Sequence, residues 1–475
     1  MSIDARPNIS PPLFTVADLR VVEQHWERIH PGESLMEKAG AAAAALAVTL
    51  AGMLDQAILI LAGQGNNGGD AVVAARLLAA QGYRVEVVSR AADELLPQAA
   101  TNAWHSWRAG GGTALPDIPL ARQYSLVIDG LFGIGLQRDI TGQEARWIEQ
   151  ANTFNCPRLA LDVPSGLDSD SGKIRGHALR ANHTLTFVGL KPGLLTADGP
   201  DVCGKLHLDR LGIDAWVVAP TLGIALTGLE NRHRLPPRAR NSHKGQYGHI
   251  GILGGSPGMV GAALIAGRAA LEQGAGSVTL GVLDERIAVD YAEPRLMFRI
   301  VENLLDMQTT ILAAGPGLGQ SPRAHALLKR ALTASCPLVL DADALNLLAV
   351  DSALVQQTIR RTAPTLITPH PGEAARLLKV DTATIQHNRI EAARKLSALT
   401  HAHVALKGAG TVIFHPDGHY AINTSGGPWL AQAGSGDRLT GMVAALLGQG
   451  MAAQDALEAA VWLHGNSRVT NGRSD

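Results

Sequence analysis

The sequence predicts an α/β protein of two domains, each built around a mostly parallel sheet. The chain has 475 residues, which is more than one ordinary hydrophobic core accommodates. Glycine is abundant at 52 residues, aromatic residues make up only 4%, and 46% of the residues are hydrophobic. Short apolar runs alternate with helical segments, and this alternation restarts after a non-periodic stretch at residues 231–243. Strands that alternate with helices form parallel sheets covered on both faces.

The first half begins with an alanine-rich segment at residues 39–54, which predicts a buried helix, since a membrane span needs about 20 strongly apolar residues. Residues 58–62 form the first predicted strand. The loop at 63–70 and a helix at 71–80 follow it. Further buried strands are predicted at residues 85–88, 126–128, 159–161 and 184–187.

The basic, proline-containing stretch at 231–243 predicts a linker, which divides the chain into domains at residues 1–230 and 231–475. After it, strands are predicted at 250–253 and 278–280, with a helix at 261–273 between them. Five more strands are predicted at residues 311–314, 338–340, 366–368, 404–406 and 412–414.

Composition excludes several functional classes. The formal net charge of −1 argues against a broad nucleic-acid-binding surface, which needs a basic excess. The three cysteines, Cys156, Cys203 and Cys336, show no metal-ligand spacing and predict reduced thiols in a cytoplasmic protein. Residues 1–20 lack the pattern of a signal peptide, and we expect no membrane partner.

Polar residues follow three strands of the first half. The loop at 63–70 reads GQGNNGGD, and its glycines and the following helix start favour an anion close to the backbone. Asp129 and Asp162 each close a predicted strand. Each aspartate alone is typical of a helix cap or a turn. Because carboxyl ends of parallel strands share one edge of the sheet, the three together predict a ligand site.

These motifs carry a resemblance. The runs ESLMEKAG, GQGNNGGD, DGLFGIGL, DVPSGLD and LKPGLLTADGP, in this order over residues 15–215, resemble the YjeF N-terminal domain family of NAD(P)H-hydrate epimerases. The resemblance implies a Rossmann-like three-layer domain. It also implies that Asn67, Asp129 and Ser165 hold a potassium ion.

The same resemblance implies positions for the substrate, a hydrated NADH or NADPH. The residues expected at its phosphates are Asn66, Asn67, Gly68, Gly69, Asp70, Gly133, Ile134, Gly135, Leu136, Gln137, Arg138 and Asp139. Asp162 is expected near the nicotinamide ring as the general acid/base. Lys191 is a second candidate participant. An exposed or phosphate-contacting lysine is an equally good interpretation of it.

The second half has glycine loops at several predicted strand ends, and the clearest precedes a helix at 439–447. There the backbone N–H groups of Ser435, Gly436 and Asp437 are expected to form an anion hole. Asp437 is placed to take a proton from a substrate hydroxyl that attacks a phosphoryl group. The chain has no GxxxxGK[ST] P-loop, so another class of phosphoryl transfer is predicted.

Over residues 240–465, the motifs SHKGQYGHIGILGGSPGMVGAA, GPGLG, LDADALN, TPHPGEAARLL, LKGAGTVI and AGSGDRLTG resemble the NAD(P)H-hydrate dehydratase family of the ribokinase-like superfamily. The resemblance implies a ribokinase-like α/β domain with Asp437 as the base. Ala262, Gly317, Gly319 and His370 would line the substrate pocket. The nucleotide would contact Lys407, Gly408, Ala409, Gly410, Thr411 and Gly436.

The family uses ADP in bacteria and ATP in eukaryotes, so ADP with Mg²⁺ is expected here and ATP is an alternative. Glu373 occupies the superfamily's magnesium-associated position. Asp341 and Asp343 are expected to have structural roles, with contact to metal-bound water as the alternative. The resemblance also implies a homo-oligomer, and a tetramer is common in the family.

Four features depart from the family patterns. Ala71 replaces a glycine, and a positive φ there would cost about 1–2 kcal/mol. Trp429 replaces a small residue and is expected to reshape a nucleotide-side loop, and Arg438 is expected to lower the pKa of Asp437. After residue 465 the pattern of a last helix is not found, so this helix is expected to be missing.

Two alternatives to a bifunctional repair enzyme stay open on the sequence. One is a small-molecule kinase of ribokinase type with a non-catalytic first half. The other is a binding protein, or an epimerase whose second site has decayed. The departures at Trp429 and Arg438 and the expected loss of the last helix motivate the second alternative.

Overall fold

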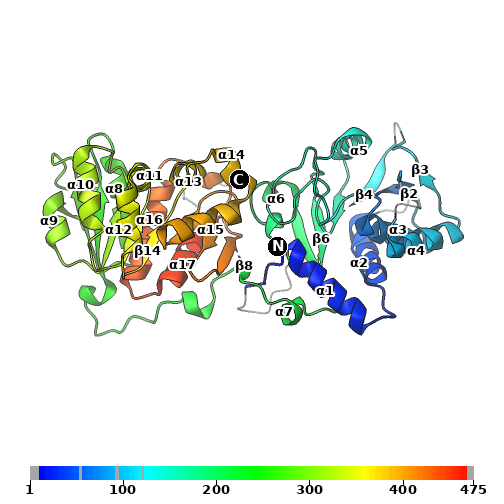
Figure 1. Ribbon diagram of the computed structural model, residues 1–475, viewed down its shortest axis with the longest axis horizontal. Coiled ribbons are helices and arrows are strands. Elements are labelled where there is room, and N and C mark those ends of the chain that lie inside the picture. Colours follow the sequence, from blue (N-terminus) through cyan, green and yellow to red (C-terminus); the bar gives the residue numbers. More distant parts are fainter. Residues whose placement is uncertain (1–9, 53–55, 91–95, 120–121, 468–475) are drawn as a thin grey trace. The chain divides into compact units, whose positions relative to one another are not determined.

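The computed structural model describes residues 10–52, 56–90, 96–119 and 122–467, and the chain divides into two compact units (Figure 1). The first unit is Pro11–Gly223. The second runs from Ile224 onward and includes Ser10. The division precedes the predicted linker at 231–243, because β8 (Gly223–Leu226) joins the sheet of the second unit and buries Leu226 in its core.

The first unit contains a seven-stranded sheet in the order β3-β2-β1-β4-β5-β6-β7, and every pairing in it is parallel. Its strands are β1 (Ala57–Ala62), β2 (Val85–Val88), β3 (Ala114–Leu115), β4 (Tyr124–Gly130), β5 (Arg158–Leu161), β6 (His183–Phe187) and β7 (Lys205–Asp209). The five predicted strands are confirmed. β3 and β7 were not predicted, because β3 has two residues and β7 mixes polar with apolar residues.

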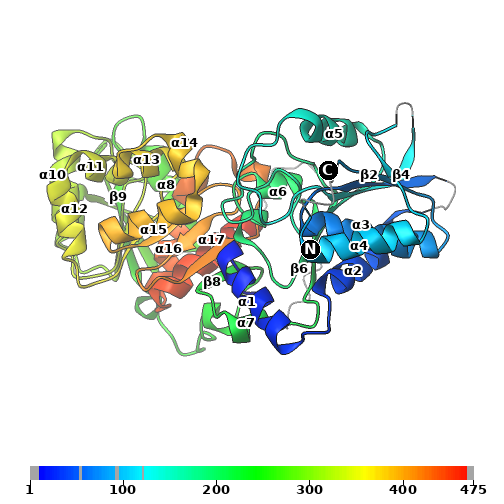
Figure 2. The same ribbon diagram turned by 45° about the vertical axis from the view of Figure 1, so that its right-hand side comes forward.

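Helices cover both faces of this sheet, which gives three layers (Figures 1 and 2). Ile58 and Ile60 of β1 face one core, together with α2 (Leu35–Leu50), α3 (Asn66–Ala80) and α4 (Gln98–Ala109). Leu59 and Leu61 face the other core, with α5 (Gly142–Thr153). This alternation follows from the two-residue side-chain period of a strand. The remaining helices are α1 (Val16–Ile29), η2 (Pro192–Leu194), α6 (Gly199–Val202) and α7 (Ala215–Val218).

The predicted buried helix at 39–54 corresponds to α2, which ends at Leu50; residues 53–54 lie outside the described residues. Its alanines and Gly40 let α2 approach α3 closely, because a Cβ at Gly40 would lie 2.4 Å from the side chain of Val73. Among the described residues, no helix combines the length and the apolar character that crossing a membrane requires.

The second unit contains a ten-stranded sheet in the order β11-β10-β9-β12-β13-β14-β15-β16-β17-β8. Pairing is parallel from β11 to β15 and antiparallel from β15 to β17. The strands are β9 (His249–Gly254), β10 (Ser277–Val282), β11 (Met297–Ile300), β12 (Ile311–Ala314), β13 (Leu338–Leu340), β14 (Thr365–Ile367), β15 (His403–Leu406), β16 (Val412–Phe414) and β17 (Tyr420–Asn423). All seven strands predicted for this half are present, whereas β8, β11 and β17 were not predicted.

Helices also cover this second sheet (Figure 1). The longer ones are α8 (Val260–Glu272), α10 (Pro322–Ala331), α11 (Asp343–Val350), α12 (Ser352–Ile359), α13 (Pro371–Leu378), α15 (Arg389–Thr400), α16 (Ser435–Gly448) and α17 (Ala453–Asn466). The shorter ones are η3 (Asn231–His233), η4 (Lys244–Tyr247), α9 (Val301–Asp306), α14 (Thr382–His387) and η5 (Pro428–Leu430). α8 and α16 pack side by side, and a Cβ at Gly441 would lie 2.0 Å from the carbonyl oxygen of Ala266.

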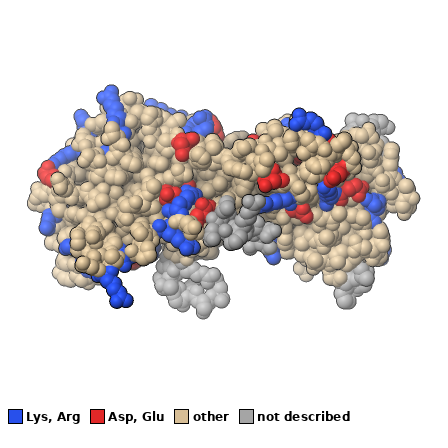
Figure 3. Space-filling model, turned by 90° about the horizontal axis from the view of Figure 1, so that it is seen from below, with Lys and Arg blue, Asp and Glu red and all other residues tan. Residues whose placement is uncertain are grey.

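The surface carries charges of both signs. On the face shown in Figure 3, lysine and arginine side chains are interspersed with aspartate and glutamate side chains. This distribution agrees with the formal net charge of −1. On that face it produces no broad basic field of the kind that holds a nucleic-acid backbone.

Candidate active sites

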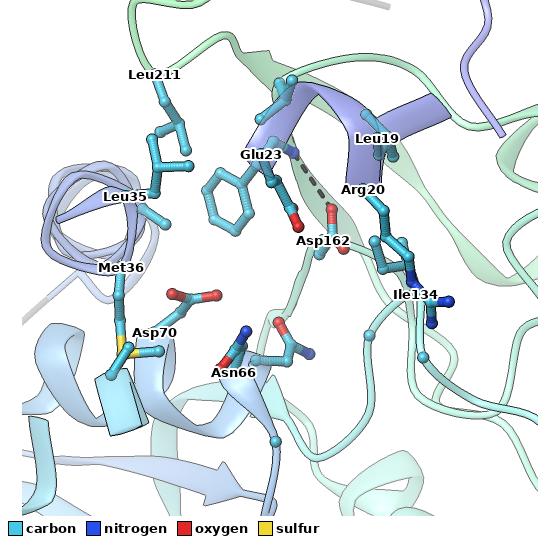
Figure 4. A pocket seen from close by; sticks show the side chains of 18 of the residues that line it. Leu19, Arg20, Glu23, Leu35, Met36, Asn66, Asp70, Ile134, Asp162 and Leu211 are labelled. Carbon is cyan, nitrogen blue, oxygen red and sulfur yellow. Dashed lines mark hydrogen bonds between the residues drawn. The ribbon is translucent and has the colours of Figure 1, made fainter. Parts of the chain in front are cut away.

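The first unit contains a cavity of about 490 Å³ at the carboxyl ends of its central strands. Residues that follow β1, β4, β5 and β6 line it, together with residues of α1 and α2 (Figure 4). The strand order reverses between β1 and β4, and open α/β sheets bind ligands at such a switch point.

The start of α3 forms one wall of the cavity. α3 begins at Asn66, so the Asn-rich loop is the first turn of a helix whose N–H groups favour an anion. Two glycines allow this close approach. A Cβ at Gly68 would lie 2.0 Å from the carbonyl oxygen of Gly63, and a Cβ at Gly63 would lie 1.9 Å from that of Leu131.

Asp162 and Lys191 form a buried ion pair beside the cavity. Asp162 follows β5 with φ of 64°, a left-handed conformation that is uncommon outside glycine and often marks functional positions. The Lys191 ammonium is 1% exposed and donates to the Asp162 carboxylate. It also donates to Thr186 Oγ1 and to the Phe187 carbonyl, both at 2.8 Å. The structure therefore excludes an exposed Lys191.

Asp129, Ser165 and Asn67 lie around the loop after β4. Ser165 donates to the Asp129 carboxylate through its hydroxyl at 2.6 Å and its backbone N–H at 2.8 Å. Burial raises the pKa of Asp129 to about 6, although the hydrogen bonds from Ser165 and Leu131 oppose this. Among the described residues, no side-chain cation pairs with Asp129, and both amide atoms of the buried Asn67 have no hydrogen-bond partner. A buried carboxylate with a hydroxyl and an orphaned amide oxygen nearby suits a hard monovalent cation.

The predicted substrate residues divide into two groups. Those that line the cavity are Asn66, Asn67, Asp70, Gly133, Ile134, Gly135, Leu136, Asp162 and Lys191. Gly68, Gly69, Gln137, Arg138 and Asp139 do not line it. Gly68 and Gly69 instead provide close packing: a Cβ at Gly69 would lie 2.5 Å from the Met36 sulfur.

Sequence reasoning missed the wall that α1 contributes. Leu19, Arg20 and Glu23 of this helix line the cavity, and Glu23 lies beside Asp162 in Figure 4. One signal was present: Leu19 is buried, and Glu23 follows it by four residues and so shares its helix face. An acidic residue on the buried face of a helix is unusual enough to suggest a role.

In the second unit, the buried Asp341 and the partly exposed Lys407 form an ion pair at the carboxyl ends of β13 and β15. Lys407 Nζ lies 2.8 Å from Asp341 Oδ1, and Thr440 Oγ1 of α16 donates to Asp341 Oδ2, also at 2.8 Å. Burial lowers the pKa of Lys407, but the negative charges of Asp341 and Glu373 outweigh it and the pKa is raised overall. The pair is therefore charged and ties α16 to two strand ends.

α16 brings Asp437 near this pair, close enough for the charges of Asp341 and Lys407 to act on it. Burial, followed by the negative charge of Asp341, raises the pKa of Asp437 to about 6, while Lys407 opposes the rise. The prediction that Arg438 lowers this pKa is wrong. The Arg438 guanidinium turns away to Glu272, with an N–O distance of 2.8 Å.

The anion hole predicted at the start of α16 is smaller than expected. The N–H of Ser435 donates to the carbonyl of Gln432 at 3.3 Å, so it is engaged within its own loop. Gly434, with φ of 84°, precedes the helix and leaves the amides of Gly436 and Asp437 in its first turn. A Cβ at Gly436 would lie 3.1 Å from Lys407 Nζ, so these amides and the lysine share one small region.

A buried arginine supports the loop after β15. The Arg389 guanidinium, 1% exposed, donates to the carbonyls of Leu406 at 3.0 Å and Lys407 at 3.2 Å. Gly408 has φ of 143°, and a Cβ there would lie 2.6 Å from Arg389 Nη1. Arg389 was not predicted, because nothing in its local sequence separates it from a surface arginine. Gly410 also has positive φ, and Thr411 Oγ1 donates to the Gly408 carbonyl.

His370 and Glu373 form the start of α13. The His370 N–H donates to Glu373 Oε2 at 2.8 Å, and Glu373 is 4% exposed. Lys407 Nζ lies 4.0 Å from the same oxygen. Because one oxygen serves the helix cap and faces a lysine, Glu373 does not offer magnesium a free pair of oxygens. Among the described residues, no group of three or more His, Cys or acidic residues could hold a metal ion.

The other predicted substrate residues lie around β9 and β12. Gly317 and Gly319 have φ of 59° and 74°, and a Cβ at Gly317 would lie 2.3 Å from the carbonyl oxygen of Met259. Asp343 accepts a hydrogen bond from the Gly319 N–H at 2.8 Å, which fixes the backbone of this loop. Ala262 lies in the first turn of α8, close in sequence to Met259.

Comparisons with known proteins identify both halves. The family model described as YjeF-related protein N-terminus matches residues 32–193, and that described as NAD(P)H-hydrate dehydratase matches residues 250–470. The bifunctional NAD(P)H-hydrate repair enzyme Nnr of Escherichia coli K12 is 39% identical over 417 residues, covering 86% of this chain and 79% of that protein. The enzyme of the same name from Coxiella burnetii is 37% identical, and the match covers 86% of this chain and 84% of that protein. The one from Moorella thermoacetica is 38% identical, and the match covers 86% of this chain and 82% of that protein.

This chain belongs to the bifunctional NAD(P)H-hydrate repair enzyme family.

A solved structure also matches the second half of this repair enzyme. The ADP/ATP-dependent NAD(P)H-hydrate dehydratase of Bacillus subtilis, co-crystallised with ATP and Mg²⁺, is 35% identical with a TM-score of 0.43. The match covers 50% of this chain and 84% of that one. Family membership over both halves favours the repair enzyme over a kinase with a non-catalytic first half.

The departures from the family patterns have modest structural consequences. The predicted strain at Ala71 is absent, because Ala71 lies inside α3 and not at positive φ. Trp429 is 47% exposed, and its ring lies over Gly427 within its own loop. Residues 468–475, where the last helix was expected to be missing, lie outside the described residues.

Proposed function

We propose that the first unit of this repair enzyme interconverts the R and S epimers of hydrated NADH and NADPH, and that the second dehydrates the S epimer with ADP. One observation carries the division: each unit has its own polar site at the carboxyl edge of its own sheet. Asp162 with Lys191 occupies the first site, and Asp437 near the Lys407–Asp341 pair occupies the second.

In the first site, Asp162 acts as general acid/base on the C6 hydroxyl of the substrate. When the ring nitrogen's lone pair expels the hydroxyl, C6 becomes planar, and water can return to either face. The Lys191 ammonium holds the Asp162 carboxylate in place through its hydrogen bonds to Thr186 and Phe187. The start of α3 and the loop at Gly133–Leu136 receive the phosphates, because helix N–H groups favour anions there.

Asn67, Asp129 and Ser165 fit a potassium ion, as their oxygen atoms and the orphaned Asn67 amide indicate. When bound, the ion supplies positive charge near the phosphates of the substrate. Independently of the ion, Asp129 accepts hydrogen bonds from the Ser165 hydroxyl and the Leu131 N–H and so holds both groups in position.

In the second site, Asp437 takes the proton of the C6 hydroxyl as that oxygen attacks the β-phosphoryl group of ADP, and AMP leaves. The ring nitrogen then expels phosphate, and loss of a proton from C5 restores the reduced nicotinamide. With a pKa of about 6, Asp437 is ionised at neutral pH yet basic enough to accept a proton. ATP is the alternative donor.

The nucleotide binds at the Lys407–Thr411 loop and Gly436, where Lys407 and the first amides of α16 supply positive charge. Ala262, Gly317, Gly319 and His370 line the substrate side. Magnesium binds together with the nucleotide, through the nucleotide's phosphates. Glu373 does not hold the ion by itself, because one of its oxygens accepts the hydrogen bond that caps α13.

Exchanging each aspartate for asparagine tests this division. We expect Asp437→Asn to lower dehydration by about 10²–10⁴-fold and to leave epimerisation intact. Asp162→Asn is expected to do the reverse. Dehydration is followed by the near-ultraviolet absorbance of the reduced nicotinamide, with S epimer, Mg²⁺ and ADP or ATP. Epimerisation is followed by chromatography without nucleotide. A parallel loss of both activities in either variant would contradict the proposal.

A homo-oligomer and a cytoplasmic location stay predictions. All three cysteines are free, which agrees with a reducing compartment. Light scattering on the purified chain checks the oligomer, and fractionation of the source cells checks the location.

A further inference from the structure

The α1 wall of the epimerase cavity contains a carboxyl group that the mechanism above does not use. Glu23 lies on the face of α1 that is turned to the cavity, near Asp162 and Asp70 (Figure 4). The three carboxyl groups come from three different elements: α1, the end of β5 and α3. Among the described residues, no hydrogen bond or ion pair with Glu23 is formed, although Arg20 and Lys191 lie close enough to act on its charge.

The surroundings of Glu23 favour its protonated form. Burial raises the pKa of Glu23, the charge of Asp162 raises it further, and Lys191, which is itself paired with Asp162, lowers it only in part. Glu27 also raises it, and Arg20 lowers it. Burial and the charges of Asp162 and Glu23 likewise raise the pKa of Asp70 well above its usual range. The cavity therefore combines a carboxylate that is paired with a lysine and two carboxyl groups whose pKa values are raised by burial and by neighbouring negative charge.

Epimerisation at C6 is faster when the site supplies both a proton donor and a proton acceptor. The hydroxyl leaves C6 more easily if an acid protonates it, and the returning water adds more easily if a base takes its proton. Because the two steps occur on opposite faces of a planar ring, two groups on different walls serve better than one. Active sites divide acid and base roles between carboxyl groups whose surroundings push their pKa values apart.

We propose that Glu23 is a second catalytic residue of the epimerase, which works with Asp162 from a different wall of the cavity. This rests on the proposed function of the first site. As the C6–O bond breaks, Glu23 gives its proton to the departing hydroxyl, which leaves as water, and the nitrogen lone pair forms the C=N bond. Water then adds to the other face, the C=N electrons return to nitrogen, and the proton of that water passes to Asp162. Exchange with solvent then returns a proton to Glu23 and removes one from Asp162, and the reverse reaction exchanges the two roles.

The test is the pH profile of epimerisation for Glu23→Gln. Purified S epimer is incubated with the full chain in the absence of nucleotide, so that dehydration does not occur, and the R epimer is measured by chromatography. The rate without enzyme is subtracted. We expect the variant to be about 10²–10³-fold slower. We also expect it to lose the alkaline limb of the wild-type profile, since that limb reports the group that must be protonated.

Two further variants separate chemistry from structure. Glu23→Asp keeps the acid and is expected to keep the alkaline limb with a smaller loss of rate, which decides the matter even if Glu23→Gln folds poorly. Glu149→Gln removes an exposed carboxylate of the same unit outside the cavity lining and is expected to match wild type. Glu23→Gln removes a buried, repelled carboxyl group, so the melting temperature of the first unit is expected to be unchanged or higher.

Three results would overturn the proposal. The Glu23→Gln variant could have a rate within about threefold of wild type, or it could keep the alkaline limb of the pH profile. Alternatively, the alkaline limb could be lost in Asp70→Asn and not in Glu23→Gln. Failure of the proposed function itself looks different. In that case the wild-type chain does not exceed the rate without enzyme, and Asp162→Asn has no effect either.

Discussion

At the residue scale, the two aspartates proposed as catalytic occupy opposite electrostatic settings. Asp162 is paired with the buried Lys191 ammonium, whereas Asp437 faces a second negative charge on Asp341. Asp162 itself adopts a backbone conformation that residues other than glycine avoid, with φ of 64°. Strain of this kind is held where the surrounding structure fixes a side chain for chemistry.

The raised pKa of Asp437 predicts how dehydration depends on pH. A base must be deprotonated to act, and a carboxyl group with a pKa of about 6 is mostly ionised at pH 7. Below about pH 6 we therefore expect kcat for dehydration to fall about tenfold per pH unit. The measurement is the initial rate of absorbance increase at saturating ADP and S epimer between pH 5 and 8.

The nucleotide phosphate also titrates, so a control is needed. Asp341→Asn removes a negative charge that raises the pKa of Asp437 and frees Lys407 to lower it. The acid limb should then move to lower pH. A limb that stays in place in this variant belongs to the nucleotide and not to Asp437.

At the element scale, contacts between backbones position both sites. In the first unit, Gly63 and Gly68 allow β1, α3 and the loop after β4 to meet, and in the second, Gly441 allows α16 to lie against α8. Since Asp437 and Thr440 are on α16, the site of the second unit depends on this helix contact.

Gly441→Leu tests that dependence. A side chain at this position meets the carbonyl of Ala266 and forces α8 and α16 apart. We expect a loss of about 1–3 kcal/mol in the unfolding free energy of the second unit, together with slower dehydration and unchanged epimerisation. Urea unfolding and the two activity assays measure these effects.

Gly261→Ala is the matched control, because Gly261 also lies in a helix of this unit but has open space around its Cβ position. It is expected to raise the unfolding free energy by about 0.5–1 kcal/mol. An equal loss of stability in both variants would show that the α8–α16 contact is not the cause.

At the scale of the whole molecule, each unit has its own hydrophobic core. Two clusters fill the two faces of the first sheet, and a separate cluster with Leu226 and α16 fills the second unit. Because a ligand stabilises only the body that binds it, the two units should respond separately to their ligands.

Calorimetry with and without ADP and Mg²⁺ checks this separation. We expect two unfolding transitions, of which only the one belonging to the second unit moves to higher temperature. A nucleotide at about 100 times its dissociation constant contributes about 2.7 kcal/mol. Asp437→Asn should keep the shift, since the proposed nucleotide site is the Lys407 loop. A single transition that moves as a whole would show that the two units unfold together.

The sequence by itself determined the alternation of strands and helices and the residues at the strand ends. Buried parallel strands are continuous apolar runs, and the polar residues that end them, such as Asp129, Asp162 and Lys407, are recognisable locally. The family resemblance added roles that local patterns do not contain.

Only the tertiary structure decided the features that depend on contacts between distant segments. Glu23 has only a weak signal in its local sequence and Arg389 has none, because residues more than 15 positions away create the surroundings of both side chains. The same holds for the shift in the pKa of Asp437. Burial and the charge of Asp341 raise this pKa, whereas Arg438, the next residue in the chain, pairs with Glu272 instead. Burial and charge act through space, so a neighbour in the fold outweighs a neighbour in the chain.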